Sequence, residues 1–598
     1  MSLDWGMAMH HLIRPLALAA AAFTLASVSP AEEAQYSPEL LAHLDPSARA
    51  ADLCGGKDGA GAMRAKLMVS AAAVQAAGET ALRLVDGLGK VHFPITTSSP
   101  EAQRYFDQGL GFAYGFNHAA AIAAFREAQR LDSDCALCFW GESMAHGPNI
   151  NAPMDPRTTA RAVGLAIYAN WLARKGTAAE QALTAAMVKR YSTAPDADQN
   201  AMNAAYADAM LAAAKAHPAV DDIALLAAEA AMDTRPWDYW AADKQPQPRL
   251  GEAVQLVEAV LARNPDHPQA AHLYIHLMEN GPDPKRAEAA ADRLAAPLAP
   301  AAGHLVHMPA HIYYRLGRWQ DSMRVNVDAA RADEAWIRAS GDKGLVRYGY
   351  YPHNVHFIVT SAQMAGDMGT AMREARKLAG ILDPRISSQI AWIQAVNAAP
   401  FFTAAQFASP AQILAMKAPD VRLPYPTAMR HYARALAFAQ QRNRAGFGRE
   451  LARLETMRKS AAFQPMIDQG VPATDLLQIA ETVARARWAS ASGDLARAAR
   501  LYRDAVAIED RIPYMEPPYW YYPVQQSLGA ALYRAGRYSE AAEAFTAALV
   551  RAPNNGWALY GLAAAERASG RKVQAAAAEA ALKRAWAGDR RWLRMDRI

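Results

Sequence analysis

Residues 521–576 read YYPVQQSLGAALYRAGRYSEAAEAFTAALVRAPNNGWALYGLAAAERASGRKVQAA and carry the clearest sign of the fold. Alanine, leucine and other helix-favouring residues fill segments of helical length. Glycine-containing turns separate these segments. Small and aromatic residues recur within each segment at the spacing of one helix face. The stretch therefore predicts helix pairs joined by tight turns.

The same pattern recurs elsewhere, as YFDQGLGFAYGFNHAAAIAAFREAQRLDSD at 105–134, ASGDLARAARLYRDAVAIED at 491–510, LGRWQDSMRVNVDAA from Leu316 and AGDMGTAMREARKLAG from Ala365. It resembles the tetratricopeptide repeat (TPR), a helix–turn–helix unit of about 34 residues. The resemblance is closest at six positions of the last copy: Gly536, Tyr538, Ala541, Phe545, Ala548 and Pro553. It implies an all-α, right-handed TPR-like superhelical solenoid of helix pairs, with at most a short strand near His92.

Composition excludes some partner classes. The 598 residues carry a net charge of +5 without long basic runs, so we expect no nucleic-acid partner. The patterns divide the chain into a signal peptide (1–31), a helical and extended leader (32–98), TPR-like helices with a CxxC motif and a GPNIN loop (99–240), His-rich repeats (241–380), an irregular helical segment (381–470) and C-terminal TPR repeats (471–598).

The N-terminal segment has the pattern of a secretory signal peptide. Arg14 precedes an apolar run from Leu16 to Val28, and small residues continue to Ala31. We therefore expect a periplasmic or secreted protein, with an uncleaved anchor as the alternative. No later stretch reaches the roughly 18 uncharged apolar residues of a membrane span, so we expect none in the mature protein.

Seven of the 16 histidines lie between positions 272 and 356. His272, His276 and Glu279 are spaced i, i+4, i+7, and His304, His307 and His311 are spaced i, i+3, i+7, so each set falls on one helical face. His272 to His307 and His276 to His311 both span 35 residues, which indicates a repeat.

Alignment of the turns extends this repeat to a third helix. If Ala287, Ser322 and Ala371 are equivalent, His272, His307 and His356 share one position of the first helix of a pair, His276 and His311 a second, and His304 and His353 a third. The TPR resemblance implies that these positions line the concave, ligand-binding surface. Pro309 must start or kink its helix, and an insertion between Asp333 and Tyr350 lengthens the third spacing.

Clustered neutral imidazoles are typical transition-metal ligands. We therefore predict a site for one or two ions of copper or zinc at His272, His276, His304, His307, His311, His353 and His356. Glu279 and Tyr314 are the candidate catalytic groups, and Asn354 a candidate contact around the site. The alternative is that each histidine only packs between helices.

Other candidates are weaker. Cys135 and Cys138 favour a local disulfide or structural thiols over catalysis, because no thioredoxin-like context surrounds them. Asn149 and Asn151 lie in an unusual loop that we expect to reach the cavity. Trp237 and Trp520 lie in aromatic–proline loops that either fill the core or line a substrate pocket.

The motifs RPWDYW, HPxxxHxYIH, GHLVHMPAHIYxRLGR, YPHN and NGWALYGL are similar to a family of large exported bacterial TPR proteins. That resemblance implies the repeat fold and export, not a reaction. Two hypotheses follow from the histidines. The first is a metal-dependent enzyme, a copper oxidoreductase or zinc hydrolase, acting on a small-molecule or peptide substrate. The second is a non-catalytic scaffold that binds a partner peptide or protein in the concave groove.

Overall fold

The computed structural model describes residues 83–296 and 298–598, which belong to one compact unit, Ser37–Ile598. The predicted signal peptide, most of the leader and Cys54 lie outside these residues. The described residues are helical and contain no β-strand, only the isolated bridges Asn149–Ala152 and Trp240–Pro246. The predicted all-α superhelical repeat of helix pairs is confirmed, and the segment near His92 is irregular rather than a strand.

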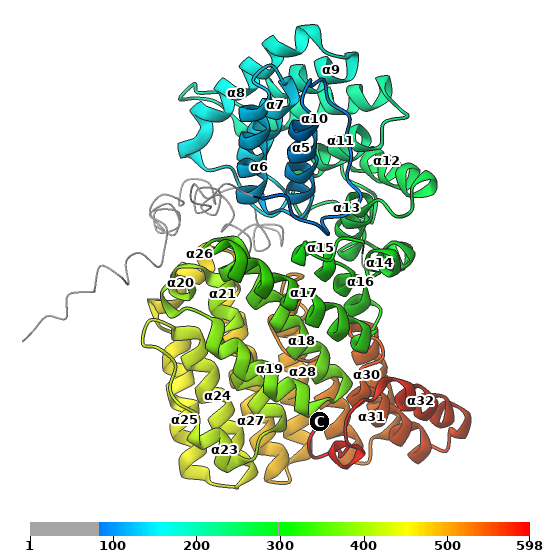
Figure 1. The fold of residues 1–598 in the computed structure, drawn as a ribbon. Helices are drawn as coiled ribbons and strands as arrows, with labels where there is room; N and C mark the ends of the chain where they lie inside the picture. Colours follow the sequence, from blue (N-terminus) through cyan, green and yellow to red (C-terminus); the bar gives the residue numbers. More distant parts are fainter. Residues whose placement is uncertain (1–82, 297) are drawn as a thin grey trace, which may run out of the picture. The chain divides into compact units, whose positions relative to one another are not determined.

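The helices before residue 300 form the first part of this repeat (Figure 1). They are α5 (Pro100–Tyr114), α6 (His118–Leu131), α7 (Ala136–His146), α8 (Thr159–Leu172), α9 (Ala178–Met187), α10 (Gln199–Ala216), α11 (Asp221–Asp233), α12 (Leu250–Arg263), α13 (Pro268–Glu279) and α14 (Glu288–Leu294).

The middle of the chain combines three helices of 14 to 22 residues, α17 to α19, with several short ones. They are α15 (Gly303–His307), α16 (Pro309–Arg315), α17 (Trp319–Ser340), α18 (Tyr351–Ala365), α19 (Met368–Ile381), α20 (Pro384–Gln389), α21 (Ala391–Val396), α22 (Ala399–Phe407) and α23 (Pro410–Ala415).

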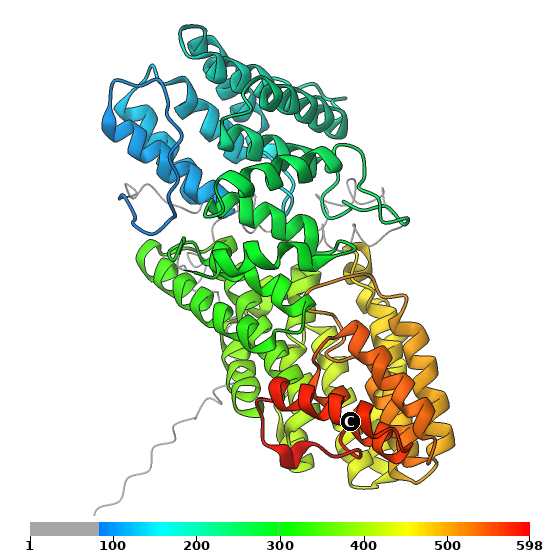
Figure 2. The same cartoon turned by 90° about the vertical axis from the view of Figure 1, so that its right-hand side faces the viewer.

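The C-terminal helices again pack side by side (Figure 2), joined mostly by short turns but with a longer loop between α28 and α29. They are α24 (Pro424–Gln440), α25 (Arg444–Arg458), α26 (Gln464–Asp468), α27 (Ala473–Ala491), α28 (Leu495–Glu509), α29 (Val524–Arg534), α30 (Tyr538–Arg551), α31 (Gly556–Ala568) and α32 (Lys572–Ala585).

Consecutive helices pack against each other as hairpins, for example α5 with α6, α17 with α18, α27 with α28 and α29 with α30. The α29–α30 turn needs glycine, because Gly536 has φ +76°, which side chains disfavour. Each pair buries its apolar face against the next pair, which is how repeat proteins build a continuous core.

One packing contact is repeated at both ends of the described chain. The buried ring of Phe545 on α30 lies against Gly529 of α29 and Gly561 of α31, where an added Cβ would lie 3.0 Å and 2.1 Å from the ring. The ring of Phe125 on α6 is enclosed in the same way by Gly109 and Gly141, with 2.6 Å and 2.5 Å. The aromatic residue of the second helix thus fits only because both neighbouring helices lack a side chain there.

Helix ends follow from local sequence. Ser99 caps α5 and Pro100 is its first residue. Pro309 begins α16 directly after α15, because proline cannot donate to the preceding turn. The insertion after Asp333 is taken up by the last turns of α17 and a π-helical turn, Val346–Tyr350, that leads into α18. None of the described helices is both long and apolar enough to cross a membrane.

Candidate metal centre

The predicted first helices of three consecutive pairs carry the histidines. His272 and His276 lie on α13, His304 and His307 on α15, His311 on α16, and His353 and His356 on α18. The first six of these side chains gather in two adjacent groups and are between 0% and 7% exposed. The helices α13, α15, α16 and α18 therefore bring these side chains into one buried cluster.

The first group contains His272, His276 and His304, whose candidate ligand atoms lie within 4.8 Å of one another. Nε2 of His272 is 3.2 Å from Nε2 of His304. Two imidazole nitrogens bound tetrahedrally to one zinc ion would lie about 3.3 Å apart. This spacing suits a shared ion as well as a hydrogen bond.

The second group contains His307, His311 and His353, with candidate ligand atoms again within 4.8 Å. Nε2 of His307 is 2.9 Å from Nε2 of His311. The groups adjoin, since the ring centroids of His304 and His307 are 6.1 Å apart and those of His276 and His311 are 6.2 Å apart.

An outer set of acceptors orients the rings. Nδ1 of His272 lies 2.9 Å from Oε1 of Gln269, and Nδ1 of His307 lies 2.7 Å from Oδ1 of Asn326. The amide groups are themselves fixed, because Gln269 donates to Glu229 and Asn326 donates to the carbonyl of Ser322. Each acceptor therefore selects the tautomer that carries hydrogen on Nδ1 and leaves the Nε2 lone pair for a ligand.

Glu279 orients one histidine of each group through its Nδ1 atom. Its Oε1 lies 2.7 Å from Nδ1 of His276, and its Oε2 lies 2.6 Å from Nδ1 of His311. Oε2 of Glu516 also lies 3.0 Å from Nδ1 of His311. Glu279 is therefore placed to orient two imidazoles, and the structure gives it no contact that marks it as a catalytic base.

The charges of the cluster follow from burial and from these carboxylates. Burial and the neighbouring imidazoles hold the pKa of His272 and of His304 well below the usual value. Burial also opposes charge on His311, but Glu279 and Glu516 outweigh it and raise its pKa to about 9. The facing Nε2 atoms of His307 and His311 thus need a positive charge between them, either the second proton of His311 or a metal ion.

Aromatic rings enclose both groups. Phe116 lies 4.7 Å from His272, and Phe357 lies 4.9 Å from His307 and 5.0 Å from His353, measured between ring centroids. Trp237 meets His276 edge-on at 5.0 Å and has φ +67°, a strained conformation for a bulky residue. Trp237 therefore packs against the cluster.

A small cavity of about 30 Å³ adjoins the second group. His353, His356, Trp392 and Glu516 are among its lining residues. This volume holds one or two water molecules. A peptide does not fit beside the buried histidines.

Two predicted residues lie outside the two groups. His356 lines the small cavity beside the second group, and Phe357 packs on the rings of His307 and His311. Asn354 donates to Asp333 at 2.7 Å instead of reaching the histidines.

Two further predicted residues belong to neighbouring packing. Tyr314 packs edge-on against Trp319, and its hydroxyl is engaged with Thr360. Burial raises the pKa of Tyr314, which disfavours the phenolate that a base would need. Trp520 packs with Phe402 and Tyr432 in a separate aromatic group.

The loop with the two asparagines reaches the edge of the cluster. Asn151 donates to the hydroxyl of Tyr350 at 3.5 Å, and the Tyr350 ring stacks on His304 at 4.5 Å. Asn149 instead lies 3.1 Å from Nε2 of His118. Cys135 and Cys138 form a fully buried disulfide at the start of α7.

Three residues of the outer set were absent from the sequence prediction: Gln269, Asn326 and Glu516. Gln269 precedes His272 by three residues, a helical spacing that could have indicated it. Asn326 lies on the second helix of its pair and Glu516 lies 205 residues beyond His311, so no local pattern points to them.

Comparison with known proteins identifies a tetratricopeptide repeat and indicates no activity. Residues 524–555, which span α29 and α30, match the tetratricopeptide repeat model. No curated protein matches the chain. Among solved structures, human IFIT1 in its dimer with PPP-AAAA is 10% identical, covers 81% of this chain and 91% of its own, and has a TM-score of 0.29. Yeast Tom70 is 13% identical, covers 81% and 96%, and has a TM-score of 0.22. Similarities this low carry no argument about this chain.

Proposed function

We propose that this protein is an exported transition-metal-binding protein that holds one or two ions of copper or zinc in the six-histidine cluster. The orientation of four imidazoles carries the proposal. His272, His276, His307 and His311 each have an acceptor at Nδ1, so their Nε2 atoms are left to face the interior of the groups. Structural packing alone does not require four histidines to share this orientation.

The donor set favours copper or zinc over harder ions. Magnesium and calcium prefer oxygen ligands, whereas three imidazoles per group suit copper and zinc. Few carboxylates bridge the two groups. Because two-zinc centres typically contain bridging carboxylates, this favours copper. Export is supported by the N-terminal sequence and by the disulfide, because disulfides persist in oxidising compartments.

Catalysis is the finer part of the proposal. A three-histidine site with an open position activates water when the ion is zinc and supports redox chemistry when it is copper. The cavity of about 30 Å³ beside His353 limits any reactant at the second group to a few atoms. We therefore propose a small molecule, rather than a peptide, as substrate there.

Metal retention tests the proposal. Chain starting at residue 32 is freed of metal with a chelator, incubated with Cu(II) or Zn(II) at pH 7.5, desalted and assayed by elemental analysis. We expect about one to two ions per chain, and retention below about 0.1 ion per chain contradicts a metal site. The scaffold hypothesis would then take its place.

A matched pair of double variants locates the site. His276→Ala with His311→Ala removes one ligand from each group and is expected to reduce retention at least about tenfold. His92→Ala with His217→Ala removes two histidines outside the cluster and is expected to retain metal as the native chain does. Circular dichroism checks that both variants keep their helices.

A further inference from the structure

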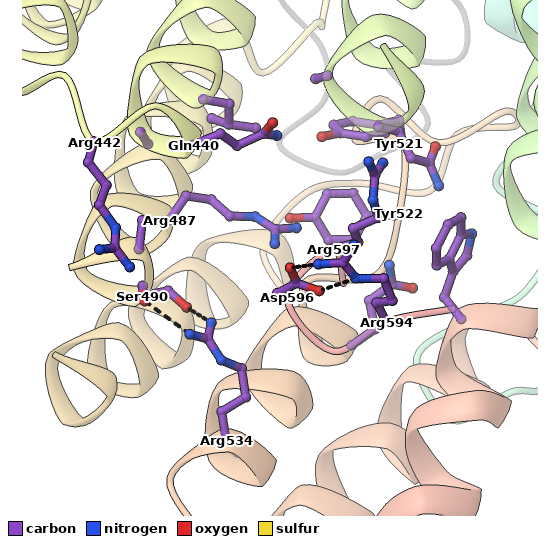
Figure 3. Close-up of a pocket in the computed structure, with 17 residues that line it drawn as sticks. Gln440, Arg442, Arg487, Ser490, Tyr521, Tyr522, Arg534, Arg594, Asp596 and Arg597 are labelled. Atoms are coloured by element: carbon purple, nitrogen blue, oxygen red, sulfur yellow. Dashed lines mark hydrogen bonds and ion pairs between the residues drawn. The ribbon is translucent and has the colours of Figure 1, made fainter. Parts of the chain in front are cut away.

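A second, larger cavity lies between the C-terminal helices. Its volume is about 410 Å³, and its lining comes from α22, α24, α27, the loop between α28 and α29, α29, α31 and the segment after α32. Figure 3 shows labelled side chains that converge from α24 and the turn after it, α27, the loop before α29, α29 and the C-terminal segment. The volume is that of a site for a small organic molecule.

The lining is strongly cationic. It contains five arginines and a single carboxylate, that of Asp596. Asp596 is bound by Arg594, which leaves Arg442, Arg487, Arg534 and Arg597 without a carboxylate partner among the described residues. Four unneutralised guanidinium groups around one cavity create a positive potential that favours an anion.

Arg487 is the most informative of these arginines. Its charge is surrounded by tyrosine rings, and its Nη2 lies 3.4 Å from the hydroxyl of Ser527. Arg487 is half-buried, and no carboxylate among the described residues pairs with it. The buried Arg190 does have such a partner, Asp233 at 2.7 Å. Partial withdrawal of a charge from water without a counter-ion is unfavourable. The fold therefore holds Arg487 in a position where a bound anion would stabilise it.

Arg534 on α29 reaches towards α27, where it donates to the hydroxyl and to the carbonyl of Ser490 (Figure 3). Both partners are neutral, so its positive charge remains available. Guanidinium groups bind phosphate oxygens in pairs, with planar N–H forks that a single ammonium group does not provide. Several guanidinium groups around one cavity therefore suit a tetrahedral dianion better than they suit a single carboxylate.

The rest of the lining suits an organic group. Tyr521, Tyr522 and Trp557 contribute aromatic surface, and Gln440 and Gln526 contribute neutral hydrogen-bonding groups. The cavity has more room than inorganic phosphate alone would need.

We propose that this cavity binds a small phosphorylated organic molecule, with the phosphate among Arg442, Arg487 and Arg534 and the organic part against the aromatic wall. The histidine cluster contributes none of the residues lining the cavity, so this binding is independent of the proposed metal site.

Calorimetry on the metal-free chain at low ionic strength tests the proposal with phenyl phosphate, inorganic phosphate, benzoate and a Glu-rich hexapeptide. We expect phenyl phosphate to bind most tightly, with an affinity at least about fivefold above inorganic phosphate because of the aromatic wall. Benzoate is expected to bind more weakly than phenyl phosphate, because it accepts from a single fork.

Three variants assign the binding to the cavity. Arg487→Gln, and separately Arg442→Gln with Arg534→Gln, are each expected to weaken phenyl phosphate at least about tenfold. The second variant changes exposed side chains, so it keeps the test decisive if Arg487→Gln fails to fold. Arg500→Gln on the exposed face of α28 is the control and is expected to bind like the native chain.

Two results overturn the proposal: no binding of either phosphate compound, or binding that the double variant leaves unchanged. Tighter binding of the peptide or of benzoate than of phenyl phosphate also overturns it, and assigns the cavity to carboxylates. Metal retention is measured on the same variants and is expected to be unchanged, so failure of one site does not imply failure of the other.

Discussion

Glu279 is the residue on which the orientation of the histidine cluster depends most. Its two oxygens accept from His276 and His311, and it is completely buried. Those two hydrogen bonds, with the ion pair to His311, lower the pKa of Glu279 although burial alone would raise it. The carboxylate is therefore ionised and accepts at both oxygens.

Glu279→Gln tests this role. The amide keeps the size of the side chain but has one acceptor oxygen, so only one of the two imidazoles remains oriented. We expect metal affinity to fall by about 10–100-fold, as loss of such outer partners commonly causes, while helical content is unchanged. Competition with a chromophoric chelator measures the affinity. Glu127→Gln on α6, a partly exposed carboxylate that pairs with Arg130, is the control. An unchanged affinity of the Glu279 variant would contradict the assignment.

The sequence predicted the histidines better than their hydrogen-bond partners, because the partners are more distant in the sequence. Helical spacing places His272 with His276, and the repeat places His307 with His311, because both relations are local or periodic. Glu516 meets His311 across 205 residues, and the register of α18 depends on a π-helical turn that no spacing rule contains.

At the scale of the helix, glycine determines how closely pairs stack. Gly561 of α31 lies directly over the ring of Phe545, whereas Gly448 of α25 has nothing within 4 Å of an added Cβ. Both are helical glycines, so they differ in packing and not in backbone conformation. The repeated small residues of the sequence pattern correspond to these close contacts.

Gly561→Ala should destabilise the chain by about 1–3 kcal/mol, because the new methyl group overlaps a buried ring. Gly448→Ala is the matched control and should stabilise it by up to about 1 kcal/mol, because alanine favours the helix. Urea unfolding followed by circular dichroism measures both changes. Equal effects in the two variants would show that the Phe545 contact does not limit packing.

At the scale of the whole molecule, a buried ionic group joins the first repeats. Glu142 on α7 is fully buried and accepts from Arg126 of α6 and Arg161 of α8, both at 2.7 Å, and from Gln129 at 2.8 Å. Burial opposes its charge, yet the hydrogen bonds from His146 and Gln129 and the charge of Arg126 lower its pKa to about 2. Ionised Glu142 therefore stabilises the folded state.

The sign of its pH dependence follows. The pKa is lower in the folded chain than the ordinary value near 4.5, so the stabilisation is complete above pH 4.5 and is lost as the pH falls towards 2. The shift corresponds to about 3 kcal/mol. In Glu142→Gln we expect a lower free energy of unfolding at pH 7 and a weaker decline between pH 4.5 and 3, measured by urea unfolding at each pH. A variant that declines as steeply as the native chain would place the acid sensitivity elsewhere.

The loop between α28 and α29 connects the two candidate sites. Glu516 contacts His311, and Tyr521 lines both the small cavity beside His353 and the arginine cavity. The aromatic–proline composition of this loop predicted a wall or a plug, and the structure shows both, with Trp520 in the core. Which cavities the loop would line depended on the folding of distant repeats, which the loop's own sequence does not encode.

The double contact of Glu279 means that a single negative charge would be divided between two ions. Two charges about 6 Å apart, close to the 6.2 Å between the rings of His276 and His311, repel by about 3 kcal/mol for each pair of unit charges at an effective dielectric constant of 20, so two divalent ions repel about four times as strongly. The first ion to enter would take most of the benefit of that carboxylate, and the second would meet both the repulsion and a neutralised partner. We therefore expect the two positions to fill one after the other at well-separated concentrations, so that at scarce metal the chain carries one ion and keeps a vacant neighbouring position as reserve capacity.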